Sequence, residues 1–244
     1  MDKTVRIGWM YPDCLNLHGE RGSVQAFERI GGAMGLEMQL RRIEDFDDPI
    51  PFDGLDLLFF APGEITCLEF IRPALERQRP ALERYLENGG WLIAVGTTGL
   101  LFGRTTNRTD GSVFEGLGLL DMTAREREYV WGDDLHFRLA DSKMEIFGSQ
   151  IQMADVEAAA PLGEVLYGRG NNADGSEGAR RGNLIFTNCL GPVFVKNPWW
   201  TEDILRQIVL QRQGIAAAGP YALESASFAS CLRFTKNKPE YPIE

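Results

Sequence analysis

Few side chains in this chain could carry nucleophilic or acid–base chemistry. They include four cysteines and two histidines: Cys14, Cys67, Cys189, Cys231, His18 and His136. The cysteines form no Cys-x-x-Cys pair and the histidines are far apart, so neither a zinc site, a redox dithiol nor a His-rich metal site is predicted. We expect no metal and no cofactor. Free thiols are typical of a reducing compartment, so we place the chain in the cytoplasm.

One stretch has the pattern of a strand that carries a nucleophile into a sharp turn. The apolar run 91–95 lies between Gly89-Gly90 and Gly96, which predicts a buried strand, a tight turn and a short helix. In α/β enzymes this geometry holds a catalytic Ser or Cys at the tip of the turn. Here the tip is Gly96, followed by Thr97 and Thr98, so the expected nucleophile is missing.

Other residues near the same turn could take over such chemistry. A hydroxyl of Thr97 or Thr98 needs a base far more than a thiol does, so helix N-capping is the favoured interpretation for both. Cys67 starts a predicted helix, a position where thiols can be activated. Cys14 and His18 lie in the first loop and are the better candidates for residual chemistry or ligand contact.

The first hundred residues predict a doubly wound α/β start. Four predicted strands are connected by helices: strands at 4–11, 37–43, 57–61 and 91–95, and helices at 23–34, with Ser23 as N-cap, and at 67–88, interrupted by Pro73 and Pro80. The ligand crevice of such a fold lies at the carboxyl ends of the strands. Those ends are the loops at 12–22, 61–66 and 96–99.

The remainder is richer in strands. Between 113 and 195 we predict strands at 114–121, 134–140, 143–152, 165–167 and 183–190, and a turn or exposed loop at 170–178. A helix at 202–214 follows, with Thr201 as N-cap. We predict one domain at 1–215 and a peripheral C-terminal extension at 216–244 whose end is disordered.

Three residues outside the crevice have simpler interpretations. His136 is expected on an exposed strand face. Of the adjacent pair Trp199-Trp200, one ring is expected in the core and the other partly exposed, where it could contact a partner.

Composition limits the partners. The net charge of −10 argues against nucleic acid or an anionic membrane surface as the main partner. No apolar segment approaches the ~20 residues that are needed to span a bilayer. The first residues do not have the pattern of a signal peptide.

Four motifs resemble one protein family. They are Tyr11-Pro-Asp-x-Leu-Asn16-Leu-x-Gly19-x-Arg21-Gly22, Phe114-Glu-Gly-Leu-Gly-Leu-Leu-Asp121, Tyr167-Gly-x-Gly170-Asn171-Asn172 and Gly191-Pro-x-x-x-Lys196-Asn197. Their order and spacing are similar to those of CobB/CobQ-type class I glutamine amidotransferases, most closely the glutaminase subunit of lipid II isoglutaminyl synthase. The resemblance implies a flavodoxin-like α/β fold, with a mostly parallel central sheet flanked by helices and a β-rich C-terminal half. It also implies a Mur-ligase-like synthetase partner.

The catalytic positions of that family are altered in this chain. In the family a Cys–His pair hydrolyses glutamine while backbone N–H groups hold the oxyanion. Here the nucleophile position is Gly96 and the base position is Leu190, one residue after Cys189, which we expect to be buried in packing. The family's Gly-Gly-Gly is Ala61-Pro62-Gly63, and a proline has no N–H to give. A His-Gly-Gly segment is replaced around 148–151.

These changes predict an amidotransferase-like subunit without glutaminase activity, which scaffolds or regulates a Mur-ligase-like synthetase in cell-wall precursor amidation. Two alternatives remain open. One is altered chemistry in the same crevice; the other is non-hydrolytic binding of a small ligand such as an amino acid. No catalytic residue is intact, and the candidate crevice residues are Asn16, His18, Arg21, Pro62, Gly63, Cys67, Thr97, Thr98 and Cys189.

Overall fold

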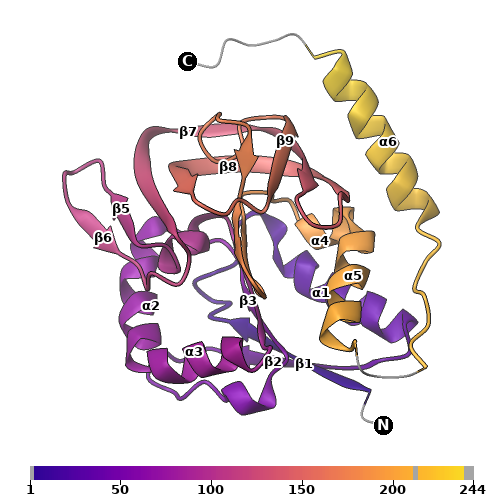
Figure 1. Ribbon diagram of the computed structural model, residues 1–244, viewed down its shortest axis with the longest axis horizontal. Helices are drawn as coiled ribbons and strands as arrows, with labels where there is room; N and C mark the ends of the chain where they lie inside the picture. The colour runs from indigo at the N-terminus through magenta and orange to yellow at the C-terminus, as the bar shows by residue number, and fades with distance from the viewer. Residues whose placement is uncertain (1–2, 211–213, 239–244) are drawn as a thin grey trace.

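The first of two sheets forms the centre of the molecule. The computed structural model describes residues 3–210 and 214–238 (Figure 1). This sheet has the strand order β11-β12-β4-β3-β1-β2. Its strands are β1 (Thr4–Met10), β2 (Glu37–Ile43), β3 (Leu57–Phe60), β4 (Trp91–Val95), β11 (Ala179–Arg181) and β12 (Leu184–Thr187). All neighbours pair in parallel except β11 with β12. The order β2-β1-β3-β4-β12 is the flavodoxin-like order, which confirms the predicted fold class.

Burial explains the order of the strands. Every residue of β3, β4 and β12 is buried, whereas in β2, at the edge, all residues before Ile43 are exposed or partly buried. Strands covered on both faces must be apolar throughout, so the continuous apolar runs lie in the centre. Helices α1 (Arg21–Ala33) and α5 (Pro198–Ile208) lie on one side of this sheet, and α2 (Ile65–Arg77) and α3 (Arg79–Glu87) on the other (Figure 1).

The second sheet carries the β-rich half of the chain. It has the order β10-β9-β7-β5-β6, with β8 paired to β7. The strands are β5 (Thr105–Asn107), β6 (Val113–Glu115), β7 (Met122–Leu139), β8 (Glu145–Ala158), β9 (Gly163–Tyr167) and β10 (Ser176–Glu177). The predicted strand at 114–121 is therefore wrong beyond Glu115. β7 begins twelve residues before the predicted 134, because a shift in register between Glu126 and Trp131 breaks its alternation.

The helix starts also differ from the predictions. α1 begins at Arg21 and α5 at Pro198, so Ser23 and Thr201 are not N-caps. The Ser23 hydroxyl instead donates to the Glu20 carboxylate at 2.6 Å, and both groups are buried. α2 continues through Pro73, and the break between α2 and α3 falls at Gln78.

The turn at 170–178 is exposed at its tip, residues 173–175, and buried at both ends. The Asn171 side chain is fully buried, and its Nδ2 donates to the Gly178 carbonyl at 2.9 Å. Glu177 is also fully buried. An asparagine that satisfies backbone groups from inside a turn looks like an ordinary surface turn residue in the sequence, so the burial of Asn171 was not predicted.

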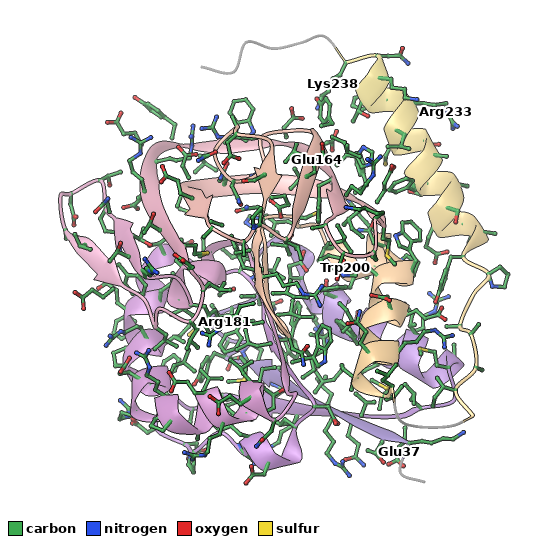
Figure 2. All side chains as sticks on the ribbon, viewed as in Figure 1. Glu37, Glu164, Arg181, Trp200, Arg233 and Lys238 are labelled. Carbon is green, nitrogen blue, oxygen red and sulfur yellow. The ribbon has the colours of Figure 1, made fainter. Side chains whose placement is uncertain are left out.

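The C-terminal extension contains a helix that the sequence did not predict. α6 (Ala222–Lys236) packs through Phe228, whose ring centroid lies 5.4 Å from that of Trp199 and 5.7 Å from that of His136. His136 is therefore buried, contrary to the exposed position predicted for it. Trp200 is buried in the core, as expected for one ring of the pair (Figure 2). The predicted disorder at the end of the extension concerns residues 239–244, which lie outside the described residues.

Just beyond the end of α6, Lys238 forms ion pairs with Asp133 and Asp134 of β7 (Figure 2).

Among residues 3–210 and 214–238, no helix is long and apolar enough to cross a membrane.

One asparagine joins the two halves of the fold, and its replacement should be costly. The buried Asn197 side chain accepts from the Phe147 N–H at 3.0 Å and donates to the carbonyls of Phe147 and Val193 at 2.9 and 2.8 Å. Asn197→Ala leaves buried backbone groups unpaired, so we expect a loss of about 3 kcal/mol in the free energy of unfolding. Denaturant titration measures the free energy of unfolding. Asn183→Ala, which removes one exposed hydrogen bond, is the matched control and should change it by less than about 0.5 kcal/mol.

Candidate functional site

The turn after β4 has the geometry of a nucleophile elbow. β4 ends at Val95, and Gly96 follows with a φ of 62° at the start of a 3-10 helix, η3 (Gly96–Leu101). Glycine adopts this left-handed conformation freely, whereas another residue is strained there. The strand, turn and short helix predicted from the sequence are confirmed.

Three altered positions meet at this turn. A Cβ atom on Gly96 would lie 3.1 Å from Pro62 Cβ and 3.3 Å from Leu190 Cδ2. Pro62 is buried and Leu190 is only 1% exposed. We call this cluster of Pro62, Gly96 and Leu190 the apolar plug. A Cβ atom at position 96 would therefore be tightly packed against both side chains.

The backbone donors beside the plug are already engaged. The Gly63 N–H donates to Thr97 Oγ1 at 3.1 Å, and the Thr97 hydroxyl donates to the Gly63 carbonyl at 2.6 Å. Pro62 contributes no N–H. Of the two N–H donors expected from this loop, that of Gly63 is already bonded and that of position 62 is absent. The loop therefore cannot bind an oxyanion in this conformation.

The two threonines do not cap a helix, contrary to the favoured interpretation. Thr98 is fully buried, and its hydroxyl donates to the carbonyls of Val95 at 2.9 Å and Phe60 at 3.2 Å. The Thr97 hydroxyl binds Gly63, as described above. Both hydroxyl protons are directed to carbonyl oxygens, which cannot accept a proton in catalysis, so neither threonine is an activated nucleophile.

The open space beside the plug is small. A cavity of about 20 Å³ is lined by Gly96, Thr97, Leu100, Ile151, Gln152, Met153, Ala154, Val156, Phe186 and Asn188. That is room for about one water molecule.

The replaced segment at 148–151 lies next to the degenerate base. Ser149 and Leu190 exchange backbone hydrogen bonds, with N–H to carbonyl distances of 3.0 and 2.7 Å. Gly148 lies against Cys189, which is fully buried. Burial raises the pKa of the Cys189 thiol, so this cysteine is an inert packing residue.

A buried carboxylate that the sequence analysis did not identify lies next to the plug. Glu20 Oε1 accepts from the N–H groups of Gly191 at 2.7 Å and Val193 at 3.3 Å, and Ser23 binds the other oxygen. Burial raises the pKa of Glu20 to about 7. Glu20 stands at an unspecified position of the Gly19-x-Arg21 motif, so the sequence carried no signal for it.

A second buried carboxylate supports the last strand. Glu177 accepts from the Thr187 hydroxyl at 2.7 Å and from the backbone N–H and Nδ2 of Asn188 at 2.8 and 3.0 Å. Burial raises its pKa as well. These bonds hold the end of β12, immediately before Cys189 and Leu190.

The first loop lies over the plug. The Leu17 N–H donates to the Pro62 carbonyl at 3.0 Å. Asn16, His18 and Arg21 are exposed, and a role for them in ligand or partner contact stays a prediction. Within the described part of the chain, no group of three or more His, Cys, Asp or Glu side chains could hold a metal ion.

Two curated proteins are similar to this chain over most of its length. No protein-family model matches the chain. Two curated relatives are both named lipid II isoglutaminyl synthase (glutamine-hydrolyzing) subunit GatD. The one from Streptococcus pneumoniae (strain ATCC BAA-255 / R6) is 22% identical over 201 residues, 79% of this chain and 76% of the relative. The one from Staphylococcus aureus (strain N315) is 27% identical over 212 residues, 83% of each chain.

Solved structures identify the fold. A structure described as a glutamine amidotransferase superposes with a TM-score of 0.53 at 14% identity, covering 83% of this chain and 98% of that chain. The chain thus has the class I glutamine amidotransferase fold.

Proposed function

We propose that this chain, a homologue of the glutaminase subunit of lipid II isoglutaminyl synthase, is an amidotransferase-like subunit that does not hydrolyse glutamine. In this proposal it binds a Mur-ligase-like synthetase in the cytoplasm and scaffolds or regulates the amidation of a cell-wall precursor. The apolar plug is the observation that carries the proposal, because Gly96 and Leu190 provide neither a nucleophile nor a base, and a Cβ atom at position 96 would meet Pro62 at 3.1 Å and Leu190 at 3.3 Å.

The chemistry of glutamine hydrolysis supports this reading. The reaction needs a nucleophile, a base to activate it and N–H donors for the oxyanion. Gly96 has no side chain, Leu190 cannot accept a proton, and the Gly63 N–H is bound to Thr97. Each requirement is missing at a different residue, so a rearrangement of one side chain does not restore the site.

The nitrogen source of the assembly tests the proposal. We expect the chain to release no glutamate from glutamine, alone or with the Mur-ligase-like synthetase of the same organism. Amidation by the pair should proceed with an ammonium salt and not with glutamine, and its rate should depend on this chain. Glutamate release and amidated product are measured in parallel, with the Staphylococcus aureus relative and its own synthetase as the active control.

Two results would contradict the proposal. One is glutamate release that exceeds the background of a heat-denatured sample. The other is failure of the two proteins to co-purify at native concentrations, which removes the scaffold role even if the chain is inactive.

A further inference from the structure

Helix α6 packs on the body of the molecule with one face and exposes the other. Phe228 and Thr235, seven residues apart, face the body, where Phe228 joins the aromatic contacts described above and Thr235 is buried. Leu223 and Phe234 lie on the opposite side. Within the described chain, Leu223 is the most exposed large hydrophobic residue, at 83%. Phe234 is 61% exposed, although the Lys238 ammonium lies 5.6 Å from its ring centroid.

The exposed residues follow one line along the helix. Leu223 and Phe234 are eleven residues apart, about three helical turns, so both point the same way. Ala226 and Ser230 lie between them at spacings of three and four residues, and both are exposed. Arg233 belongs to the same face and points away from the body (Figure 2). We call these five residues the outer face of α6.

The shape of the outer face is complementary to itself. A large apolar side chain stands at each end, Leu223 at one and Phe234 at the other, and small side chains stand between them. When two such faces meet in opposite directions, each large side chain lies beside the other kind. The small residues in the middle allow the two helix axes to approach closely.

The charges of α6 favour the same direction. Glu224 lies in the first turn of the helix, and Arg233 and Lys236 lie in the last turn. In an antiparallel pair, the acidic first turn of each helix lies near the basic last turn of the other, and the helix dipoles are opposed. A parallel pair would bring like charges together. Shape and charge therefore select one arrangement of two copies.

We propose that the outer face of α6 binds the outer face of α6 in a second copy of this chain, as an antiparallel helix pair with two-fold symmetry. Leu223 of each copy lies against Phe234 of the other, and Ala226 lies opposite Ser230. Such an interface uses one patch on both copies and closes at the dimer. A single helix pair is smaller than the roughly 1,200–2,000 Å² of a standard interface, so the dimer is weak, with a Kd in the micromolar range. This proposal does not depend on the proposed function.

Sedimentation equilibrium of the full chain, above and below micromolar concentration, tests the dimer. We expect a monomer–dimer equilibrium for the wild type. The double variant Leu223→Ser/Phe234→Ser should weaken it by about tenfold or more, because it removes both large apolar side chains. Both residues are exposed, so the variant should keep the circular dichroism spectrum of the wild type. Tyr129→Ser is the matched control, because it removes a 78% exposed aromatic residue from β7, and it should dimerise as the wild type does.

Cross-linking through introduced cysteines tests the direction. Ala226→Cys and Ser230→Cys are made as separate proteins, each with Cys231→Ser to remove the thiol of α6. The cysteines outside α6 are partly or fully buried: Cys14, Cys67 and Cys189. In the antiparallel pair, position 226 lies opposite position 230 of the second copy, but roughly 6 Å along the axis from its own equivalent. A disulfide tolerates Cα atoms up to about 7 Å apart in total. Oxidation of the mixture should therefore link position 226 to position 230, and either protein alone should give far less covalent dimer.

Three results would overturn the proposal. The first is a wild-type chain that stays monomeric at every concentration. The second is a double variant that dimerises as strongly as the wild type, which would place the interface elsewhere. The third is a cross-linked peptide that joins position 226 or position 230 mainly to its own equivalent, as a parallel pair requires.

Discussion

Replacing Gly96 by cysteine, the residue at this position in the family, should give a less stable protein that still releases no glutamate from glutamine. The new Cβ would meet Pro62 at 3.1 Å and Leu190 at 3.3 Å. A non-glycine residue at a φ of 62° costs roughly 1–2 kcal/mol, and overpacking of a filled interior costs roughly 1–3 kcal/mol. We therefore expect Gly96→Cys to lower the free energy of unfolding by about 3 kcal/mol.

A pair of alanine variants separates strain from packing. Gly111 also has a positive φ, of 85°, but nothing lies within 4 Å of a Cβ atom placed there. Gly111→Ala therefore loses stability only through the strain of its positive φ. Gly96→Ala also loses stability because its Cβ packs too closely against Pro62 and Leu190. Denaturant titration of both should show a larger loss at Gly96. Equal losses would mean that Pro62 and Leu190 can move aside for a side chain at position 96. The proposal that the plug excludes a nucleophile would then be wrong.

Restoring the base as well should not restore activity. Gly96→Cys combined with Leu190→His still has Pro62, which gives no N–H and whose ring contacts position 96. Adding Pro62→Gly removes that ring and supplies a donor. We expect the triple variant to regain part of the stability lost by Gly96→Cys, measured in the same titration. Of these variants it is the only one that has a cysteine, a histidine and an N–H donor at position 62, so glutamate release is assayed in it. Activity in the double variant would contradict the role assigned to Pro62.

The second large effect is a pH-dependent stability caused by Glu20. Its pKa is about 7 in the folded chain against a usual value of 4.5, because burial disfavours the charged form. The folded state thus holds this proton more tightly than the unfolded state. The resulting stability is fully present below pH 4.5 and is lost as the pH rises through 7. Between pH 5 and pH 8 the loss is on the order of 2–3 kcal/mol.

Glu20→Gln should remove this dependence. Its amide oxygen can accept from Gly191 and Val193 as Glu20 does, and its NH₂ group can donate to Ser23. We expect Glu20→Gln to match the wild type near pH 5 and to exceed it by about 2–3 kcal/mol at pH 8. Urea titrations at pH 5, 6, 7 and 8 measure the difference.

The difference between the two proteins isolates Glu20. Burial lowers the pKa of His18 and His136, which favours the folded state at higher pH, but both histidines are present in each protein. Glu37→Gln on the exposed edge strand β2 should follow the wild-type profile (Figure 2). A constant offset between Glu20→Gln and the wild type at all four pH values would contradict the assignment.

The central sheet could be predicted because its signal is local. The runs at 57–60 and 91–95 are entirely apolar, and only a strand covered on both faces requires that. The altered positions at 96, 190 and 62 could be identified from motif spacing, although their meeting in one plug could not. The first twelve residues of β7 and the whole of α6 were not predicted, because a register shift interrupts the alternation of β7 and the amphipathic pattern of α6 is too weak to mark a helix.

The contacts that define the site are long-range. The bond between Thr97 and Gly63 and the bond between the Glu20 carboxylate and the Gly191 N–H each join segments that only the folded sheet brings together. Residue type gives each of these groups several possible partners. The sequence therefore predicts where the crevice lies, and the packing decides what remains free to react.

The position of β12 between β4 and β11 has a consequence for synthesis on the ribosome. Roughly 90 residues, which form the whole second sheet, separate β4 from the strand that covers its open edge. At about 5–20 residues per second, the nascent chain exposes that edge for on the order of 5–20 s. Trp91–Val95 is entirely apolar and unpaired on one side during this time, which is the kind of segment that pairs wrongly with other chains. The last strand to be translated thus sets how long this apolar edge of the nascent chain stays uncovered.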